Sequence, residues 1–191
     1  MSYTLIGSTT SPYVRKIRLC LHDKIAYEFK TINYLEVHDA NYLKSINPIN
    51  KIPILIDQKQ TIYDSRVIYN YLSKKYSWTT LSIEEENILS AIDAGLDTSI
   101  NLFSLKRGGL DLAQPNTYIT RQQDRIPLIL QFLSPWARKN KEWNFLAMSL
   151  YSYLDWGSFR GLLDLTDYPD MENFLTHFQN APGVHETKIT G

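Results

Sequence analysis

Two places in the first half of the chain combine residue types that could bind a small acidic peptide. At Ile52-Pro53, a proline opens a short apolar strand, where it costs no ladder hydrogen bond. An X-Pro bond also tolerates the cis form, which would turn the backbone N–H and C=O of Ile52 outward, free to pair with an extended peptide as an added strand. Asp64-Ser65 stands at the start of a predicted helix, where free N–H groups attract a carboxylate.

The residues around these two places resemble a known binding motif. Residues 47–55 read Asn-Pro-Ile-Asn-Lys-Ile-Pro-Ile-Leu, and Asp64-Ser65 follows. This pattern is similar to the glutathione site of the glutathione S-transferase family, although a strand-turn-helix unit with an incidental proline is the alternative. Residues 10–16, Thr-Ser-Pro-Tyr-Val-Arg-Lys, resemble the serine-type members, in particular the bacterial YibF-like proteins. The resemblance covers essentially the whole chain, with specific motifs in the first part and loose ones in the second.

The resemblance implies glutathione as co-substrate and gives roles to residues near Pro53. The backbone of Ile52, just before Pro53, would pair with the cysteinyl part of glutathione. Lys51 would reach the glycyl carboxylate, and His38 would assist from its loop. The alternatives are a solvated lysine at position 51 and an ordinary exposed loop histidine at position 38.

The resemblance also assigns residues to the other end of glutathione. Asp64 and Ser65 would receive the γ-glutamyl group, a role that is compatible with capping a helix. Asp97 would approach the ammonium group of glutathione on a neighbouring subunit, which implies a homodimer. Asp93 and Asp97 share a helix face at i, i+4 spacing, so a plain solvated face is the alternative.

Ser11 is the residue that we expect to hold the reacting thiol. Ser11-Pro12 predicts a helix start, with serine as N-cap and proline at the first helical position. A thiol beside that helix end would accept a hydrogen bond from the hydroxyl, and both effects favour thiolate. Lowering a thiol pKa by about 2 units takes about 2.7 kcal/mol, and a charge-assisted hydrogen bond contributes about 1.5–3 kcal/mol. The neighbouring hydroxyls of Ser8, Thr9 and Thr10 remain alternatives.

Hydrophobic patterning predicts an α/β domain followed by an all-helical domain. Residues 1–76 read strand-helix-strand-helix-strand-strand-helix, with a weak helix in the loop 37–46 and a hairpin around residues 57–60. That order fits the thioredoxin-like domain of the family. Residues 77–82 form a linker. Residues 83–191 carry four helical patterns and an irregular tail from Pro182, as expected for the helical-bundle domain of a cytosolic glutathione S-transferase.

Composition excludes several other classes. The 191 residues carry a formal net charge of +0, whereas nucleic-acid and membrane-surface proteins need a basic excess. We see no signal peptide and no apolar run long enough to span a bilayer, so we expect a cytoplasmic protein. The single cysteine, Cys20, lies inside a predicted helix rather than at its start, which disfavours disulfide oxidoreductase chemistry. The four histidines lack the spacing of metal ligands, and we expect no metal.

We therefore expect a glutathione S-transferase that activates the glutathione thiolate for attack on a hydrophobic electrophile, as in detoxification. One alternative is a non-catalytic module of the same fold that acts through protein contacts, as in the stringent-starvation family. The other is a glutathione-dependent isomerase or dehalogenase. Members of the non-catalytic kind typically lose the hydroxyl or the acidic-Ser pair, whereas this chain keeps both.

Overall fold

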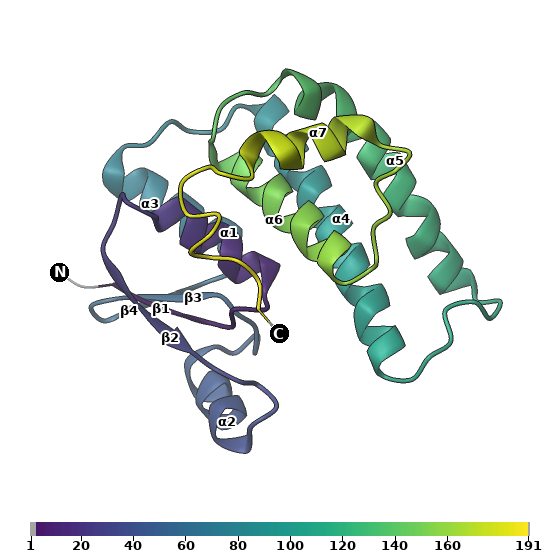
Figure 1. Cartoon of the computed structure of the whole chain (residues 1–191). Coiled ribbons are helices and arrows are strands. Elements are labelled where there is room, and N and C mark those ends of the chain that lie inside the picture. The colour runs from purple at the N-terminus through teal and green to yellow at the C-terminus, as the bar shows by residue number, and fades with distance from the viewer. Residues whose placement is uncertain (1–2, 191) are drawn as a thin grey trace. The chain divides into compact units, whose positions relative to one another are not determined.

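The structure is a computed structural model that describes residues 3–190 (Figure 1). It divides into two compact units, which we describe separately. The first unit comprises the residues up to Thr80 together with those from Asn180 onward, and the second comprises Leu81–Gln179. We expected the segment after residue 179 to belong to the helical domain, but its contacts group it with the first unit.

The first unit has a four-stranded mixed sheet with three helices. Its elements are β1 (Tyr3–Gly7), α1 (Pro12–Leu21), β2 (Tyr27–Thr31), α2 (Val37–Ile46), β3 (Ile54–Asp57), β4 (Gln60–Tyr63) and α3 (Ser65–Tyr76). The strand order is β2-β1-β3-β4. β1 pairs with β2 in parallel, and β3 runs antiparallel to both β1 and β4. The predicted order of strands and helices and the predicted hairpin are therefore both present, and the thioredoxin-like fold is confirmed.

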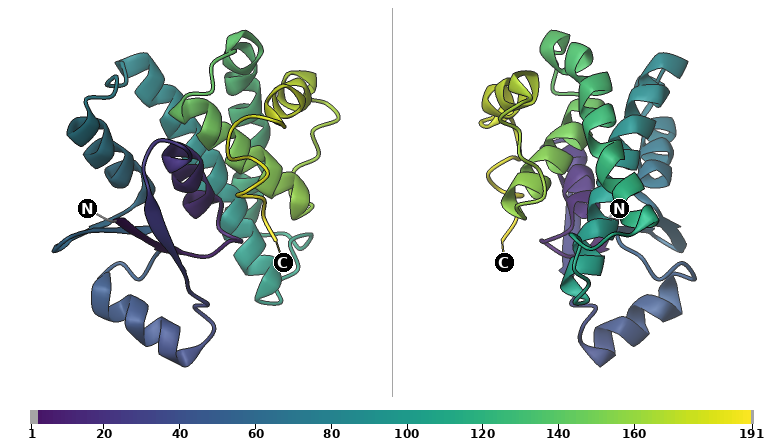
Figure 2. Two further views of the ribbon diagram at one scale, coloured as in Figure 1. Left: turned by 60° about the vertical axis from the view of Figure 1, so that its left-hand side comes forward. Right: turned by 90° about the vertical axis from the view of Figure 1, so that its right-hand side faces the viewer.

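Burial explains why β1 and β3 occupy the centre of the sheet. Leu5, Ile6, Ile54 and Leu55 are completely buried, and such apolar runs suit strands that are covered on both faces. Helices α1 and α3 lie on one side of the sheet and α2 lies on the other (Figures 1 and 2). We expected only a weak helix in residues 37–46, but the structure has a regular ten-residue helix there.

The second unit is built from four helices, as predicted. They are α4 (Ile83–Arg107), α5 (Thr117–Lys139), α6 (Phe145–Phe159) and α7 (Pro169–Phe178). Helix α6 is buried almost all round, which is typical of a central helix. Gly95 lets α4 approach α6 closely, because a Cβ atom at this position would lie 2.8 Å from the Tyr153 ring.

Candidate glutathione site

Strand register brings three of the predicted site segments to the same side of the sheet, where strands β1 and β4 end and β3 begins. We call this row of strand ends the sheet edge. The last residue pairs at that edge are Gly7 with Thr31, Ile6 with Ile54, and Ile54 with Tyr63. Consequently the turn after β1, the loop before β3 and the start of α3 after β4 all lie at this edge. We call the turn formed by residues 8–11 the hydroxyl turn, because every residue in it carries a hydroxyl group.

Ser11 caps helix α1, as predicted. Its Oγ accepts a hydrogen bond from the Val14 N–H at 3.3 Å, and its backbone carbonyl accepts one from the Arg15 N–H at 3.0 Å. The side chain is partly exposed. Because Oγ acts only as an acceptor in these contacts, its proton can be donated to a ligand.

The other three hydroxyls of the hydroxyl turn already have side-chain partners. Ser8 Oγ and Thr10 Oγ1 lie 2.9 Å apart, and Ser8 Oγ also accepts from the Thr10 N–H at 3.3 Å. Thr190 Oγ1 lies 3.5 Å from Thr9 Oγ1. The Ser11 hydroxyl, by contrast, is engaged by a backbone N–H of the helix that it caps.

The loop before β3 contains the cis bond that the sequence allowed at Ile52-Pro53. Ile52 packs against a buried cluster that includes Leu43 of α2 and Ile54 of β3. Asn50 has a φ of 54°, in the left-handed region that asparagine tolerates. Lys51 is exposed.

Asn47 holds this loop in place, a role that we did not predict. The side chain is only 1% exposed. Its Nδ2 donates to the Lys51 carbonyl at 2.7 Å, and its Oδ1 accepts from the Ile49 N–H at 3.0 Å. A signal was present in the sequence, since Asn47 opens the motif, but its partners are revealed only by the folded loop.

Asp64 and Ser65 form the start of α3. Asp64 has a φ of 75°, and its Oδ1 accepts from the N–H groups of Arg66 at 2.8 Å and Val67 at 3.3 Å. These bonds occupy two N–H groups of the first turn. Ser65, the first residue of the helix, is buried. Because the N–H groups of a first helical turn have no partner within the helix, that of Ser65 suits an anion at this helix end.

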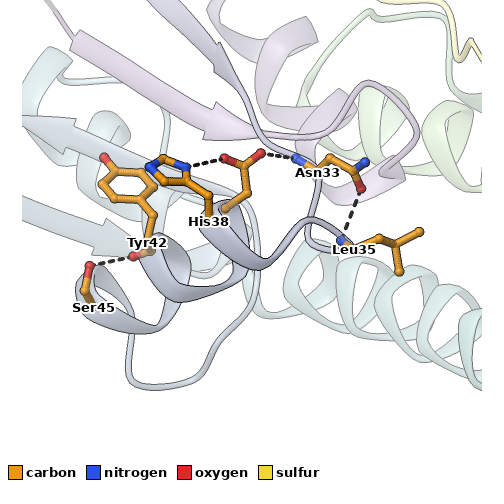
Figure 3. Close-up of polar contacts among 6 residues, drawn as sticks. Asn33, Leu35, His38, Tyr42 and Ser45 are labelled. Atoms are coloured by element: carbon orange, nitrogen blue, oxygen red, sulfur yellow. Dashed lines mark hydrogen bonds and ion pairs between the residues drawn. The ribbon is translucent and has the colours of Figure 1, made fainter.

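His38 lies on the first turn of α2 and is strongly exposed, with 93% of its side chain accessible (Figure 3). Its Nδ1 lies 3.3 Å from Asp39 Oδ1, and Asp39 Oδ2 accepts from the Asn33 N–H at 2.7 Å. The bond from the Asn33 N–H, and to a smaller extent the contact with His38, hold the pKa of Asp39 below its usual range. The structure does not bring His38 into contact with the other site residues, so its role remains a prediction.

Asp97 lies on α4 in the second unit, at an exposed position. Asp97 thus belongs to a different unit from the residues at the sheet edge, and its role also remains a prediction. Tyr3 and Cys20 are not candidates for thiol activation. Tyr3 is buried in β1, and burial raises the pKa of the Cys20 thiol to about 12.

A charged network at the other end of β3 was not predicted. Asp57 is 4% exposed, and its Oδ2 accepts hydrogen bonds from Lys75 Nζ and, at 2.5 Å, from the Tyr71 hydroxyl. The bond from Lys75 and then that from Tyr71 hold the pKa of Asp57 below its usual range. The same contact with Asp57 raises the pKa of Lys75. The network fastens α3 to β3 and lies away from the hydroxyl turn.

Within residues 3–190, no helix is both long and apolar enough to cross a membrane. Over the same residues, no group of three or more histidine, cysteine, aspartate or glutamate side chains is placed to hold a metal ion.

Comparison with known proteins shows what the first part of the chain and its fold are similar to. Residues 5–84 match the family model of the glutathione S-transferase N-terminal domain. A glutathione transferase family member from Pseudomonas fluorescens Pf-5, solved with bound glutathione, superposes with a TM-score of 0.84 at 23% identity. The superposition covers 99% of this chain and 100% of that one, and it shows a common fold. Residues 5–84 are thus similar to the N-terminal domain of the glutathione S-transferase family, and the chain as a whole shares the fold of its solved members.

Two curated relatives are similar to the first part of the chain. The GST-like protein YibF of Escherichia coli, which is described as uncharacterized, is 39% identical over 70 residues. That match spans 36% of this chain and 34% of YibF. A stringent starvation protein A homolog of Pasteurella multocida is 30% identical over 74 residues, which are 38% of this chain and 34% of the homolog. The matches thus span about a third of each relative.

Proposed function

We propose that the protein is a glutathione transferase in which Ser11 holds the glutathione thiolate for attack on an electrophilic small molecule. The observation that carries this proposal is the Ser11 hydroxyl, which caps α1 as an acceptor and keeps its proton for a ligand. The thiol proton leaves to solvent, and the sulfur forms a bond to the electrophilic carbon as that carbon releases its leaving group. Ser11 stabilises the anion and acts neither as a base nor as a nucleophile.

The sheet edge offers a binding partner for each part of glutathione. The Ser65 N–H at the start of α3 suits the γ-glutamyl carboxylate, and the backbone of Ile52 suits the cysteinyl amide. Lys51 is exposed beside Ile52 and suits the glycyl carboxylate, with the His38 imidazole as a second group for it. Asp64 contributes a negative charge for the ammonium group while it caps the helix.

We further propose that the protein works as a cytoplasmic homodimer in which Asp97 approaches the glutathione of the neighbouring subunit. The electrophile is hydrophobic in this proposal. The support for both statements is similarity to the family rather than a contact within this chain.

The test is calorimetric titration of glutathione into the wild type and Ser11→Ala, with thiolate absorbance followed against pH. We expect wild type to bind and Ser11→Ala to bind similarly, while the pKa of the bound thiol rises by about 1–2 units because a hydrogen bond of about 1.5–3 kcal/mol is lost. Conjugation at neutral pH should then fall by about 10- to 100-fold.

Thr10→Val is the matched control, because it removes an adjacent hydroxyl that is already engaged with Ser8. Its bound thiol should titrate as in wild type. If Thr10→Val raises the thiol pKa and Ser11→Ala does not, the role belongs to Thr10. Thermal melting of each variant separates the loss of the N-cap, about 1 kcal/mol, from the effect on the thiol.

The similarity to a stringent starvation protein A homolog favours a second candidate, a module that acts through protein contacts. Absence of glutathione binding to the wild type would support this candidate and reject the first.

A further inference from the structure

Residues 180–190, which we call the strap, lie alongside α1 in the first unit (Figure 1). The strap contains neither a helix nor a strand. Val184, Thr187 and Ile189 are nevertheless buried, at 5%, 2% and 3% exposure. An irregular segment that buries three side chains in this way is held by specific contacts rather than by regular backbone pairing.

Two arginines of α1 hold the strap. Arg15, only 2% exposed, donates from Nε to Thr187 Oγ1 at 3.4 Å and from Nη2 to the Val184 carbonyl at 3.3 Å. Arg18 Nη2 donates to the Glu186 carbonyl at 2.9 Å. The Thr187 hydroxyl in turn donates to the Gly183 carbonyl at 2.7 Å, so Thr187 links Arg15 to the backbone of the strap.

The contacts run the whole length of α1, from its last residues to the turn that precedes it. Gly183 has a φ of 84°, and a Cβ atom there would lie 2.9 Å from His22, just after the helix. At the other end, Thr190 Oγ1 lies 3.5 Å from Thr9 Oγ1 in the hydroxyl turn. The strap therefore runs antiparallel to α1 and ends beside the hydroxyl turn.

We infer that the strap positions the hydroxyl turn, with Arg15 and Thr187 as positioning residues that act through Ser11. Arg15 is the link, because its backbone N–H donates to the Ser11 carbonyl while its side chain holds the strap. Fixing Arg15 fixes the first turn of α1, which directly follows the hydroxyl turn, and Thr190 contacts the hydroxyl turn itself at Thr9. The consequence for the thiolate rests on the proposed function, whereas the restraint on the turn does not.

Amide hydrogen exchange on the full chain tests the restraint without any ligand. The Thr10 and Ser11 amides are bonded within the turn, to Ser8 Oγ and the Ser8 carbonyl. In Thr187→Val, which keeps the shape and removes the hydroxyl, we expect both amides to exchange about tenfold faster. Thr187→Ser keeps the hydroxyl, so both amides should exchange at the wild-type rates in this variant. Lys188→Ala, at an exposed neighbouring position, should leave them unchanged.

Two further measurements make the outcome decisive. Gly183→Ala should displace the strap independently and give the same faster exchange as Thr187→Val. The Leu55 amide in β3 should exchange at the wild-type rate in every variant, which shows that the effect is local. Unchanged exchange at Thr10 and Ser11 in Thr187→Val overturns the inference, and so does an equal acceleration at Leu55.

The pH titration of bound glutathione measures the catalytic consequence. The pKa of the bound thiol should rise in Thr187→Val and return to the wild-type value in Thr187→Ser. If wild type fails to bind glutathione, the proposed function is rejected while hydrogen exchange still decides the role of the strap. If glutathione binds and its thiol titrates identically in all variants, the strap does not act through Ser11.

Discussion

At the scale of single residues, Asp57 shows how one carboxylate fastens a helix to a sheet. Lys75 and Tyr71 stand four residues apart on α3, so they share a face and meet the same Oδ2 atom. Because Asp57 is buried, its charge needs these donors to be tolerated. Removing either donor would leave a buried carboxylate poorly solvated.

The Asp57 network predicts an acid-dependent part of the stability. The pKa of Asp57 is lower in the folded protein than the usual value of about 3.9. Its contribution is therefore fully present above about pH 4 and is lost as the pH falls through the folded pKa. Urea unfolding should show wild type more stable than Asp57→Asn at pH 7, with the gap closing below about pH 4.

Asp124→Asn provides the control for this experiment, since Asp124 is exposed. Its stability should follow that of wild type throughout. A gap between wild type and Asp57→Asn that persists unchanged to pH 2 would contradict the role that we assign to the carboxylate.

At the scale of elements, local signals predicted two helix starts, at Ser11 and Asp64, which both accept bonds from N–H groups of the helix that follows. Two further helices begin with caps of the same kind. Asn144 accepts a bond from α6, and Ser82 forms a full capping box with Glu85 in α4. Such caps depend on residues three positions apart, and a linear sequence displays them directly.

Asn144 allows the contribution of one such N-cap to the stability of the protein to be measured. Its Oδ1 accepts from the Ala147 N–H at 3.0 Å, and α6 is the buried helix of its unit. Asn144→Ala should lower the free energy of unfolding by about 1 kcal/mol, whereas Asn144→Ser should keep most of it. Equal melting temperatures for Asn144→Ala and wild type would show that the cap contributes nothing.

Elements held by distant contacts were predicted less well. Helix α2 has only Leu43 fully buried, so its periodicity is weak, and it packs instead onto Ile6, Ile32 and Ile54. In the strap, Arg15 and Thr187 lie 172 residues apart in sequence. No local pattern encodes such a pair. The same holds for the candidate site. Ser11 and Asp64 could be predicted from the sequence because a helix cap is a local feature, whereas the partners of Asn47 are set only by the folded loop.

At the scale of the whole molecule, the surface of α5 bears on the proposed homodimer. Leu128 and Phe132 share a helix face at i, i+4 spacing and are 65% and 55% exposed. Burying them against a second copy would remove apolar surface from water. Sedimentation equilibrium should therefore give twice the chain mass of 22.2 kDa.

Phe132→Lys should shift that equilibrium towards the single chain. Val37→Lys is the matched control, because Val37 is 75% exposed on a helix of the other unit and should leave the mass unchanged. A single-chain mass for wild type at every concentration would reject the homodimer.

The division of the first unit into two pieces of chain also has a consequence for synthesis. Residues 3–80 leave the ribosome before any of the strap exists, and the whole second unit must be made in between. At about 5–20 residues per second, translating those intervening residues takes roughly 5–20 s. During that interval the nascent sheet and α1 lack their last covering segment. The unit that contains the candidate glutathione site is thus begun before the second unit is made and completed only after it.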